Sequence, residues 1–291
     1  MKSYHEATAR DRLAAILDAD TFREILPPAT RLTSPHLRVL ESPVAFDDGI
    51  VIGTGLISGR HVHIAAQEGG FMGGAVGEVH GAKFCGLLER ARRTREATVL
   101  LIESGGVRLQ EANAGLIAVS EVIRAILAAR EDRLPVIAVI GGQYGCFGGM
   151  GIAATCCSAV IMSEEGRLGL SGPEVIETAR GVDEFDSRDR ARVWRTTGGR
   201  HRYLLGDCTA FVEDNLAAFR QAIVESLGAR PDFDLESLTR AQANLEARIA
   251  TFGQCHDGVD IWRALGWEDA DEVQMLPADA FVTRARDRRA V

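Results

Sequence analysis

The stretch Thr98 to Gly106 reads T-V-L-L-I-E-S-G-G, a short run of apolar residues that leads into two consecutive glycines. A second stretch of the same design, P-V-I-A-V-I-G-G, covers Pro135 to Gly142. Between them, residues 112–129 carry apolar side chains at helical spacing. Strands that are apolar throughout and alternate with helices indicate a parallel sheet with helices on both faces.

The chain on either side of these stretches continues the alternation. Two runs with strand character, 50–57 and 61–66, are separated by a Ser-Gly turn and so predict a β-hairpin. Residues 1–40 predict one short helix followed by a proline-rich link. Further along, the pattern predicts a helix over 78–95, a short buried helix over 148–157 and a strand over 158–162.

The part beyond Pro173 is mostly helical by periodicity. The helices that we expect there cover about 187–196, 209–227, 234–251 and 275–289. No linker rich in Pro, Gly or Ser separates this part from the rest. We therefore predict a single domain over 1–291, with an α/β core at about 40–180 and a helical C-terminal part at about 181–291.

Composition argues against several classes of partner and site. The formal charge of −8 disfavours a nucleic-acid partner, because binding phosphates requires a basic face. No apolar run approaches the roughly 20 residues that span a bilayer, so we expect a cytoplasmic protein without membrane insertion. The six cysteines form no C-x-x-C pair, and His61 and His63 lack a third ligand nearby. We therefore predict neither a disulfide framework nor a metal site.

Glycine turns follow two of the predicted strands, where open α/β sheets place their ligands. The first turn covers residues 103–108 and contains Gly105 and Gly106, and the second covers residues 141–151 and contains Gly148 and Gly149. Backbone N–H groups left unpaired in such turns can stabilise a developing oxyanion, because they are fixed before the reaction. The alternative is that these glycines only permit tight turns and close packing of helix on sheet.

A third glycine-rich loop covers Gly69 to Gly77 and leads into a helix. Its Phe71 and Met72 are costly to expose, which indicates that the loop covers something. The loop does not match a dinucleotide-binding fingerprint or a Walker A loop, and the chain has no G-x-S-x-G nucleophile elbow.

Several side chains near these loops are candidates for substrate contact. Tyr144 and Cys146 could donate a proton or only line a pocket, and the same alternatives apply to His80. Arg108 could hold a carboxylate or phosphate, or it could take part in an ion pair.

The motifs in this order resemble a known family. Ser104 to Glu111, S-G-G-V-R-L-Q-E, is similar to the S-G-G-A-R-x-Q-E motif of biotin-dependent acyl-CoA carboxyltransferases, and Phe71 to Gly77 is similar to their F-M-G-G-S-x-G loop. Gly172 to Glu177 resembles their G-P-R-V-I-E segment, with Glu174 in place of the arginine. His80 to Phe84 and Gly141 to Gly149 resemble the β subunits of biotin-independent malonate decarboxylases.

The resemblance implies a crotonase (ClpP)-like α/β fold of repeated ββα units with a helical C-terminal extension. It also implies two partners: a related γ subunit, and an acyl carrier protein that holds malonate as a thioester on a phosphoribosyl-dephospho-CoA arm. No cofactor is implied in this chain itself. Gly105 and Gly106 would then form the oxyanion hole, and Gly148 and Gly149 would supply its second donor. The substrate-binding residues would be Phe71, Met72, Gly73, Gly74, Arg108, Tyr144 and Cys146.

The expected reaction is decarboxylation of malonyl-S-acyl carrier protein to acetyl-S-acyl carrier protein through an enolate. Water, Tyr144 and Cys146 are all candidates for the acid that protonates the enolate carbon. One alternative is a carboxyltransferase subunit of a biotin-dependent acyl-CoA carboxylase, which uses the same enolate-stabilising half-site. Another is a non-catalytic assembly subunit. The C-terminal helices could form the partner interface or a lid.

Overall fold

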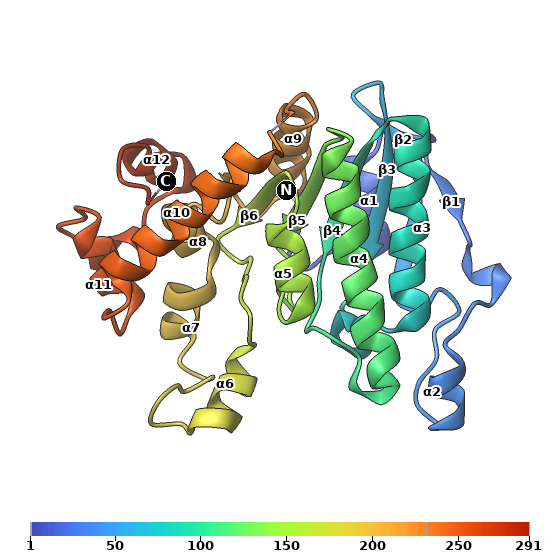
Figure 1. The fold of residues 1–291 in the computed structure, drawn as a ribbon, viewed down its shortest axis with the longest axis horizontal. Coiled ribbons are helices and arrows are strands. Elements are labelled where there is room, and N and C mark those ends of the chain that lie inside the picture. The colour runs from blue at the N-terminus through green and yellow to red at the C-terminus, as the bar shows by residue number, and fades with distance from the viewer. Residues whose placement is uncertain (1, 231, 291) are drawn as a thin grey trace.

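A seven-stranded mixed sheet lies at the centre of the computed structural model, which describes residues 2–230 and 232–290 (Figure 1). The strands follow one another in chain order. They are β1 (Arg23–Ile25), β2 (Ile50–Ile57), β3 (Arg60–Gln67), β4 (Ala97–Ile102), β5 (Val136–Ile140), β6 (Ala159–Ser163) and β7 (Ala210–Val212). β1 to β3 pair antiparallel and β3 to β7 pair parallel.

The predicted hairpin is confirmed. Ile57 pairs with Arg60 across a two-residue turn, in which Ser58 and Gly59 both have positive φ. Such a turn matches the right-handed twist of the two strands. The predicted parallel strands β4, β5 and β6 are confirmed as well, and every residue of β5 and β6 is buried.

Helices cover both faces of the sheet, and each face has its own apolar core. One core includes Phe84, Val122 and Met150 and continues into the C-terminal part through Trp262 and Phe281. The other core lies under the helices α1 (Ala9–Ile16) and α9 (Leu216–Ser226). The long helices are α3 (Glu78–Thr94), α4 (Asn113–Glu131), α9 and α10 (Leu235–Phe252), and the shorter α1 and α5 (Gly149–Thr155) also belong to the core region.

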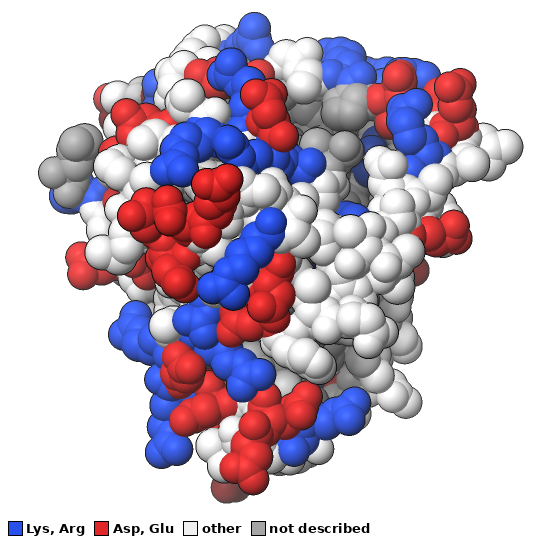
Figure 2. Space-filling view, turned by 90° about the vertical axis from the view of Figure 1, so that its left-hand side faces the viewer, with Lys and Arg blue, Asp and Glu red and all other residues white. Residues whose placement is uncertain are grey.

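The remaining elements are short. They are α2 (Pro35–Val39), α6 (Pro173–Arg180), α7 (Arg190–Thr197), α8 (Gly199–Leu205), α11 (Gly258–Ala264), α12 (Ala278–Ala285) and the 3-10 turns η1 (Pro28–Thr30), η2 (Met72–Gly74), η3 (Leu109–Glu111) and η4 (Ala270–Gln274). Over the face of the C-terminal helices, basic and acidic side chains alternate without a large field of one sign (Figure 2).

The prediction of one helix over 209–227 is wrong. This range contains β7, a turn through Asp214 and then α9, which is capped by the Asn215 side chain. The sheet therefore includes residues outside the range of about 40–180 that we expected for its core, namely β1 and β7. Both are three-residue edge strands, and their pairing with a neighbour decides their conformation more than their own periodicity does.

A second, smaller layer connects the segments that follow the parallel strands. Single parallel bridges join Val76 to Val107, Ser104 to Cys146 and Cys146 to Leu168. Each main strand is thus followed by a short bridged segment and, for β3, β4 and β5, by a helix. This repeat of two strand-like segments and a helix is the ββα arrangement that we predicted.

Candidate functional site

The two predicted glycine turns lie against each other. A Cβ atom added to Gly148 would lie only 3.1 Å from the Cα atom of Gly106, so the backbones touch. Both residues have positive φ, +124° for Gly106 and +61° for Gly148, a conformation that glycine adopts without strain. Two hydrogen bonds join the segments: Ser104 N–H donates to the Gly145 carbonyl at 2.7 Å, and Phe147 N–H donates to the Ser104 carbonyl at 2.8 Å.

The N–H groups of this junction differ in their availability. Gly105 donates to the Gly73 carbonyl at 2.8 Å and Gly148 to the Leu170 carbonyl at 3.0 Å, so these two glycines serve the fold. Gly106 donates to the Ser104 hydroxyl at 3.2 Å. The N–H groups of Val107 and Gly149 have no acceptor among the residues that the structure describes. The available donors of the two turns are therefore Val107 and Gly149.

Val107 was missed by sequence reasoning, although its position contained a signal. It follows the glycine pair in a strand-like segment, where successive N–H groups point to opposite sides. Arg108 N–H donates to Val76 on one side, so Val107 N–H faces the other side. Gly149 is available for a different reason, because it is the first residue of α5 and no helix turn precedes it.

The glycine-rich loop from Gly69 to Gly77 is fastened to the first turn rather than free. The Gly73 carbonyl accepts the bond from Gly105, and a Cβ atom on Gly74 would lie 1.8 Å from the Glu103 carbonyl oxygen. Phe71 packs on Gly49 at the base of the hairpin, and Met72 is half-buried. The loop therefore acts first as a support for the 104–107 turn.

Arg108 is enclosed in the protein instead of facing a substrate. Its guanidinium bonds Asp48 at 3.0 Å and Glu111 at 2.6 Å, and all three side chains are fully buried. Glu111 in turn accepts a hydrogen bond from the Glu78 N–H at the start of α3. Burial raises the pKa of Asp48 above its usual range, and Arg108 opposes that rise. Of the two interpretations of Arg108, the structure therefore favours the ion pair.

His80 also has a structural role. Its Nδ1 donates to the Asp48 carbonyl at 2.9 Å, and its Nε2 accepts from the Gln67 amide at 3.0 Å. Burial, assisted by the charge of Arg108, lowers the pKa of His80 to about 3. His80 is therefore neutral at physiological pH.

Tyr144 and Cys146 lie in the same turn but have opposite surroundings. Cys146 is fully buried in the apolar core, and this burial raises the pKa of its thiol far above the ordinary value. The Tyr144 side chain is 42% exposed, and its ring packs against Gly69 and Gly73. Of these two candidates for substrate contact, only Tyr144 is accessible.

Several large apolar side chains on the segments that follow β4, β5 and β6 are exposed, and we call them together the exposed apolar face. Its large side chains are Leu109, Leu116, Ile117, Ile152, Leu170 and Val175, and Leu109 is 86% exposed. α2 and α6 lie at this same end of the molecule, on either side of the ends of α4 and α5 (Figure 1). An apolar surface of this kind is typical of a binding site.

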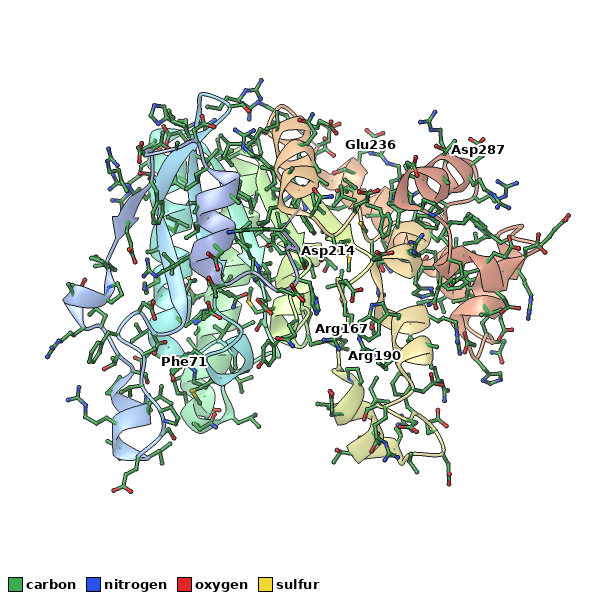
Figure 3. The ribbon with its side chains drawn as sticks, turned by 180° about the vertical axis from the view of Figure 1, so that it is seen from behind. Phe71, Arg167, Arg190, Asp214, Glu236 and Asp287 are labelled. Carbon is green, nitrogen blue, oxygen red and sulfur yellow. The ribbon has the colours of Figure 1, made fainter. Side chains whose placement is uncertain are left out.

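Two arginines add positive charge beside the second turn. Arg167 donates to the Gln143 carbonyl, and its guanidinium lies 5.0 Å from the Trp194 ring. Arg190 lies 5.1 Å from the same ring, and Figure 3 shows both arginines between the sheet and the C-terminal helices. Neither was a candidate from the sequence, because they become neighbours only through the fold of the segment after β6.

Neither a membrane-spanning helix nor a metal-binding cluster is found among the described residues. None of the helices in 2–230 and 232–290 is long and apolar enough to cross a membrane. Within the same ranges, no group of three or more His, Cys, Asp or Glu side chains is placed to hold a metal ion.

The chain matches the model of the carboxyl transferase domain over residues 3–234. It is 39% identical to the malonyl-S-ACP:biotin-protein carboxyltransferase of Malonomonas rubra, over 99% of this chain and 97% of that protein. Its structure is similar to a chain of a Pseudomonas malonate decarboxylase hetero-tetramer, with a TM-score of 0.84 and 41% identity, covering 91% of this chain and 97% of that one.

A more distant structural relative is transcarboxylase 12S, with a TM-score of 0.65 and 27% identity over 75% of this chain and 40% of that one. These likenesses confirm the crotonase-like α/β fold that the motifs predicted. From its matched residues and its relatives, this chain is a member of the carboxyl transferase domain family.

Proposed function

We propose that this chain is the β-type subunit of a malonate decarboxylase, which converts malonyl-S-acyl carrier protein to acetyl-S-acyl carrier protein and CO2. The observation that carries the proposal is the contact of the two glycine turns, where Val107 and Gly149 keep N–H groups without acceptors in the described part of the chain. The names of the relatives in Pseudomonas and Malonomonas rubra support malonate chemistry.

The reaction breaks the bond between the carboxylate and the methylene carbon of the malonyl group. The electron pair stays on that carbon and delocalises onto the thioester oxygen, which becomes an enolate oxygen. N–H groups fixed at this oxygen stabilise the transition state more than the ground state, and one such donor typically contributes about 3–4 kcal/mol. A proton then adds to the carbon and gives the acetyl thioester.

The surroundings of the turns are compatible with these steps. Once a partner subunit covers them, the exposed apolar side chains Leu109 and Leu170 would offer a poorly hydrated place for the leaving carboxylate, and Arg108 is occupied by its own ion pairs. Tyr144 and water are the candidates for the acid, because the buried Cys146 thiol has no access to the surface.

The proposal includes partners. A γ subunit would cover the exposed apolar face, and relatives solved as a hetero-tetramer and a hetero-dimer support a heteromeric assembly. An acyl carrier protein would bring malonate on a phosphoribosyl-dephospho-CoA arm. Arg167 and Arg190 support the approach of such an anionic arm. We place this complex in the cytoplasm.

A second candidate differs only in the fate of the carboxyl group. The Malonomonas rubra relative is named as a carboxyltransferase from malonyl-S-ACP to a biotin protein. Such an enzyme would form the same enolate but would pass the carboxyl group to biotin. The two candidates therefore separate by their dependence on biotin.

The test is an assay of this chain co-expressed with its candidate γ subunit and supplied with the malonyl-carrier. CO2 release would be followed with and without avidin. Release that persists in avidin and requires both subunits is expected. Carboxyl transfer that avidin abolishes would instead favour the biotin-dependent candidate, and no turnover of either kind would contradict the proposal.

A matched pair of variants tests the Gly149 donor. Any side chain at Gly149 would meet Val119, with its Cβ 2.5 Å from Cγ1, so both variants carry Val119→Ala. Gly149→Pro removes the N–H at the first position of α5, where proline is tolerated, and Gly149→Ala keeps it. We expect about 100-fold lower kcat for the proline variant than for the alanine variant. Equal kcat values would exclude Gly149 as a donor.

A further inference from the structure

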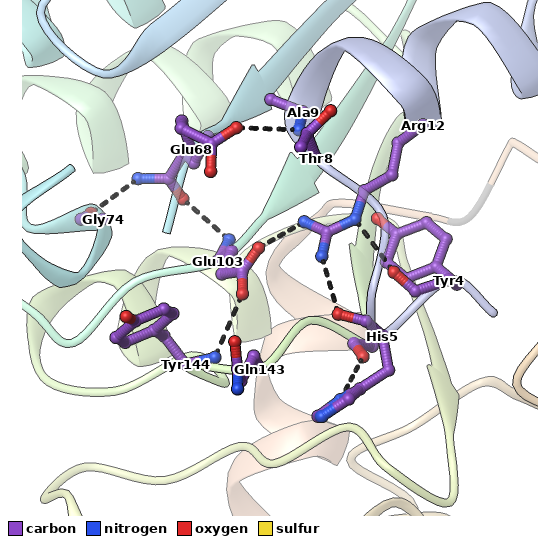
Figure 4. A network of polar contacts seen from close by, with 12 residues as sticks. Tyr4, His5, Thr8, Ala9, Arg12, Glu68, Gly74, Glu103, Gln143 and Tyr144 are labelled. Carbon is purple, nitrogen blue, oxygen red and sulfur yellow. Dashed lines mark hydrogen bonds and ion pairs between the residues drawn. The ribbon is translucent and has the colours of Figure 1, made fainter. Parts of the chain in front are cut away.

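A buried ion pair joins the N-terminal helix α1 to the end of β4, just before the first glycine turn. Arg12 is 1% exposed and Glu103 is 4% exposed. One guanidinium nitrogen, Nη1, bonds Oε2 of Glu103. The other nitrogens donate to the carbonyls of Tyr4, at 3.1 Å, and His5, at 3.4 Å (Figure 4). The arginine is thus held by the N-terminal segment, and its positive charge balances the negative charge of the Glu103 carboxylate.

The second oxygen of Glu103 faces the other turn. It accepts a hydrogen bond from the Tyr144 N–H at 3.1 Å (Figure 4). The carboxylate is packed so closely that a Cβ atom on Gly142 would lie 2.5 Å from it, and one on Gly69 would lie 2.7 Å from it. Neither glycine can therefore be replaced without moving Glu103.

The backbone of Glu103 extends these contacts to the third loop. Its N–H donates to the side-chain oxygen of Gln67 at 3.2 Å, and the amide nitrogen of Gln67 donates to the Gly74 carbonyl at 3.2 Å. One residue thus connects the N-terminal segment, the 69–77 loop, the 104–107 turn and the 141–149 turn.

We propose that Glu103, whose charge is balanced by Arg12, is a positioning residue for the reaction. It holds the 141–149 turn in a fixed position relative to the 104–107 turn. This inference rests on the proposed function for its kinetic consequence. The physical reason is that the N–H groups of Val107 and Gly149 come from different turns. They can therefore point at the same thioester oxygen only while the two turns keep their relative position. A displacement of about 1 Å can lower a rate by about 100-fold.

Two substitutions separate reach from charge. Glu103→Asp keeps the charge but is one methylene shorter, so it cannot contact Arg12 and the Tyr144 N–H together. Glu103→Gln keeps the length and an acceptor for Tyr144 but leaves Arg12 without its counter-charge. In the assembled complex we expect kcat to fall about 10- to 100-fold for Glu103→Asp, with KM changed less than about threefold. Adding Arg12→Met to Glu103→Gln should restore part of the kcat that Glu103→Gln loses.

Hydrogen–deuterium exchange reports the positioning directly. In Glu103→Asp, amide exchange should rise in the peptides covering 67–77 and 141–149 and stay unchanged in α9 and α10. The control is Ile64→Val, a change in the core on the α1 side of the sheet. It should lower Tm without changing kcat or the exchange of the two loops.

The outcomes distinguish this inference from the proposed function. Unchanged kcat and unchanged loop exchange in a folded Glu103→Asp complex would overturn the positioning role. So would an equal loss of kcat in Ile64→Val. If the wild-type complex releases no CO2, the proposed function fails, while the exchange measurement still decides whether Glu103 holds the turns. If Glu103→Asp does not fold, the double variant of Glu103→Gln with Arg12→Met decides. It keeps a side chain of the same length that can accept from the Tyr144 N–H, so the positioning role requires that its loop exchange stays close to that of the wild type.

Discussion

Arg108 shows what a charged residue in a motif can do without touching a substrate. Its two carboxylate partners come from the hairpin base, Asp48, and from η3, Glu111, so the ion pairs fix the 104–107 turn to the start of β2. The guanidinium also lies 5.3 Å from the Phe71 ring, which links it to the 69–77 loop. The arginine therefore stabilises the arrangement from which the candidate N–H donors emerge.

Removing this arginine should be costly. Arg108→Met would leave two buried carboxylates without a counter-charge, so we expect the free energy of unfolding to fall by about 3–5 kcal/mol. The control is Arg124→Met, which removes the exposed pair with Glu121 and should leave the free energy of unfolding nearly unchanged. Urea titrations of both variants give the comparison. Similar small losses in the two variants would contradict a buried, fully paired Arg108.

For single residues, the sequence indicated where the candidate site lies better than which N–H groups and side chains are available in it. The glycine pairs did indicate where two backbones meet, because glycine permits both tight turns and a close approach of backbones. Which N–H groups remain available depends on partners far along the chain, such as Gly73 for Gly105 and Leu170 for Gly148. Cys146 was misjudged for a similar reason, since its burial depends on the core between the sheet and α4.

The helices α3 and α4 pack closely against each other, and Gly81 permits this approach. A Cβ atom on Gly81 would lie 2.6 Å from the Cβ atom of Ala118 in α4. Gly86, five residues further along α3, has nothing within 4 Å of a Cβ atom among the described residues. The same helix thus contains one glycine required by packing and one that packing does not require.

This difference gives a matched test on one helix. Gly81→Ala should push α3 from α4 and lower the free energy of unfolding by about 1–3 kcal/mol. Gly86→Ala should raise it by about 0.5–1 kcal/mol, because alanine loses less backbone entropy in a helix. Chemical denaturation of the two variants gives the sign directly. A gain in both would mean that the helices separate without cost.

The long helices were predictable from the sequence, and several of the short helices were not. The range 234–251 was predicted for α10, which covers Leu235–Phe252, since its periodicity extends over 18 residues. α6, α8 and α11 span only seven or eight residues each and have too little pattern of their own. Their positions come from contacts with the rest of the chain, as with Trp262 of α11, which is buried in the main core.

Across the whole molecule, the two apolar cores connect distant parts of the sequence. The core on the α1 face includes residues from Tyr4 to Leu227, and the other extends from Ile50 to Ala285. The single-domain organisation remains a prediction, and this sharing of cores favours it. Buried ionisable groups occur both in the α/β part and in the C-terminal part of the chain. Burial lowers the pKa of His80, near the site, and of His201, in the C-terminal part, to about 3 each.

These two histidines make the stability of the whole molecule depend on pH. In the unfolded chain each takes up a proton near its ordinary pKa of about 6.5, whereas in the folded chain each stays neutral until about pH 3. The unfolded state therefore binds more protons between these values, and the free energy of unfolding falls as the pH is lowered. From pH 7.5 to 5.5 each histidine should contribute a loss of about 1 kcal/mol.

His201 offers the cleaner test, because it lies away from the glycine turns and accepts a hydrogen bond from the Trp262 indole at 3.2 Å, which a glutamine oxygen can also accept. In His201→Gln, the loss of stability between pH 7.5 and 5.5 should be smaller than in the wild type by about 1 kcal/mol. Ile64→Val, which removes no ionisable group, should leave the loss as it is. Urea titrations at the two pH values measure each difference. An unchanged pH dependence in His201→Gln would mean that His201 can take up a proton in the folded state, and that its burial does not keep it neutral.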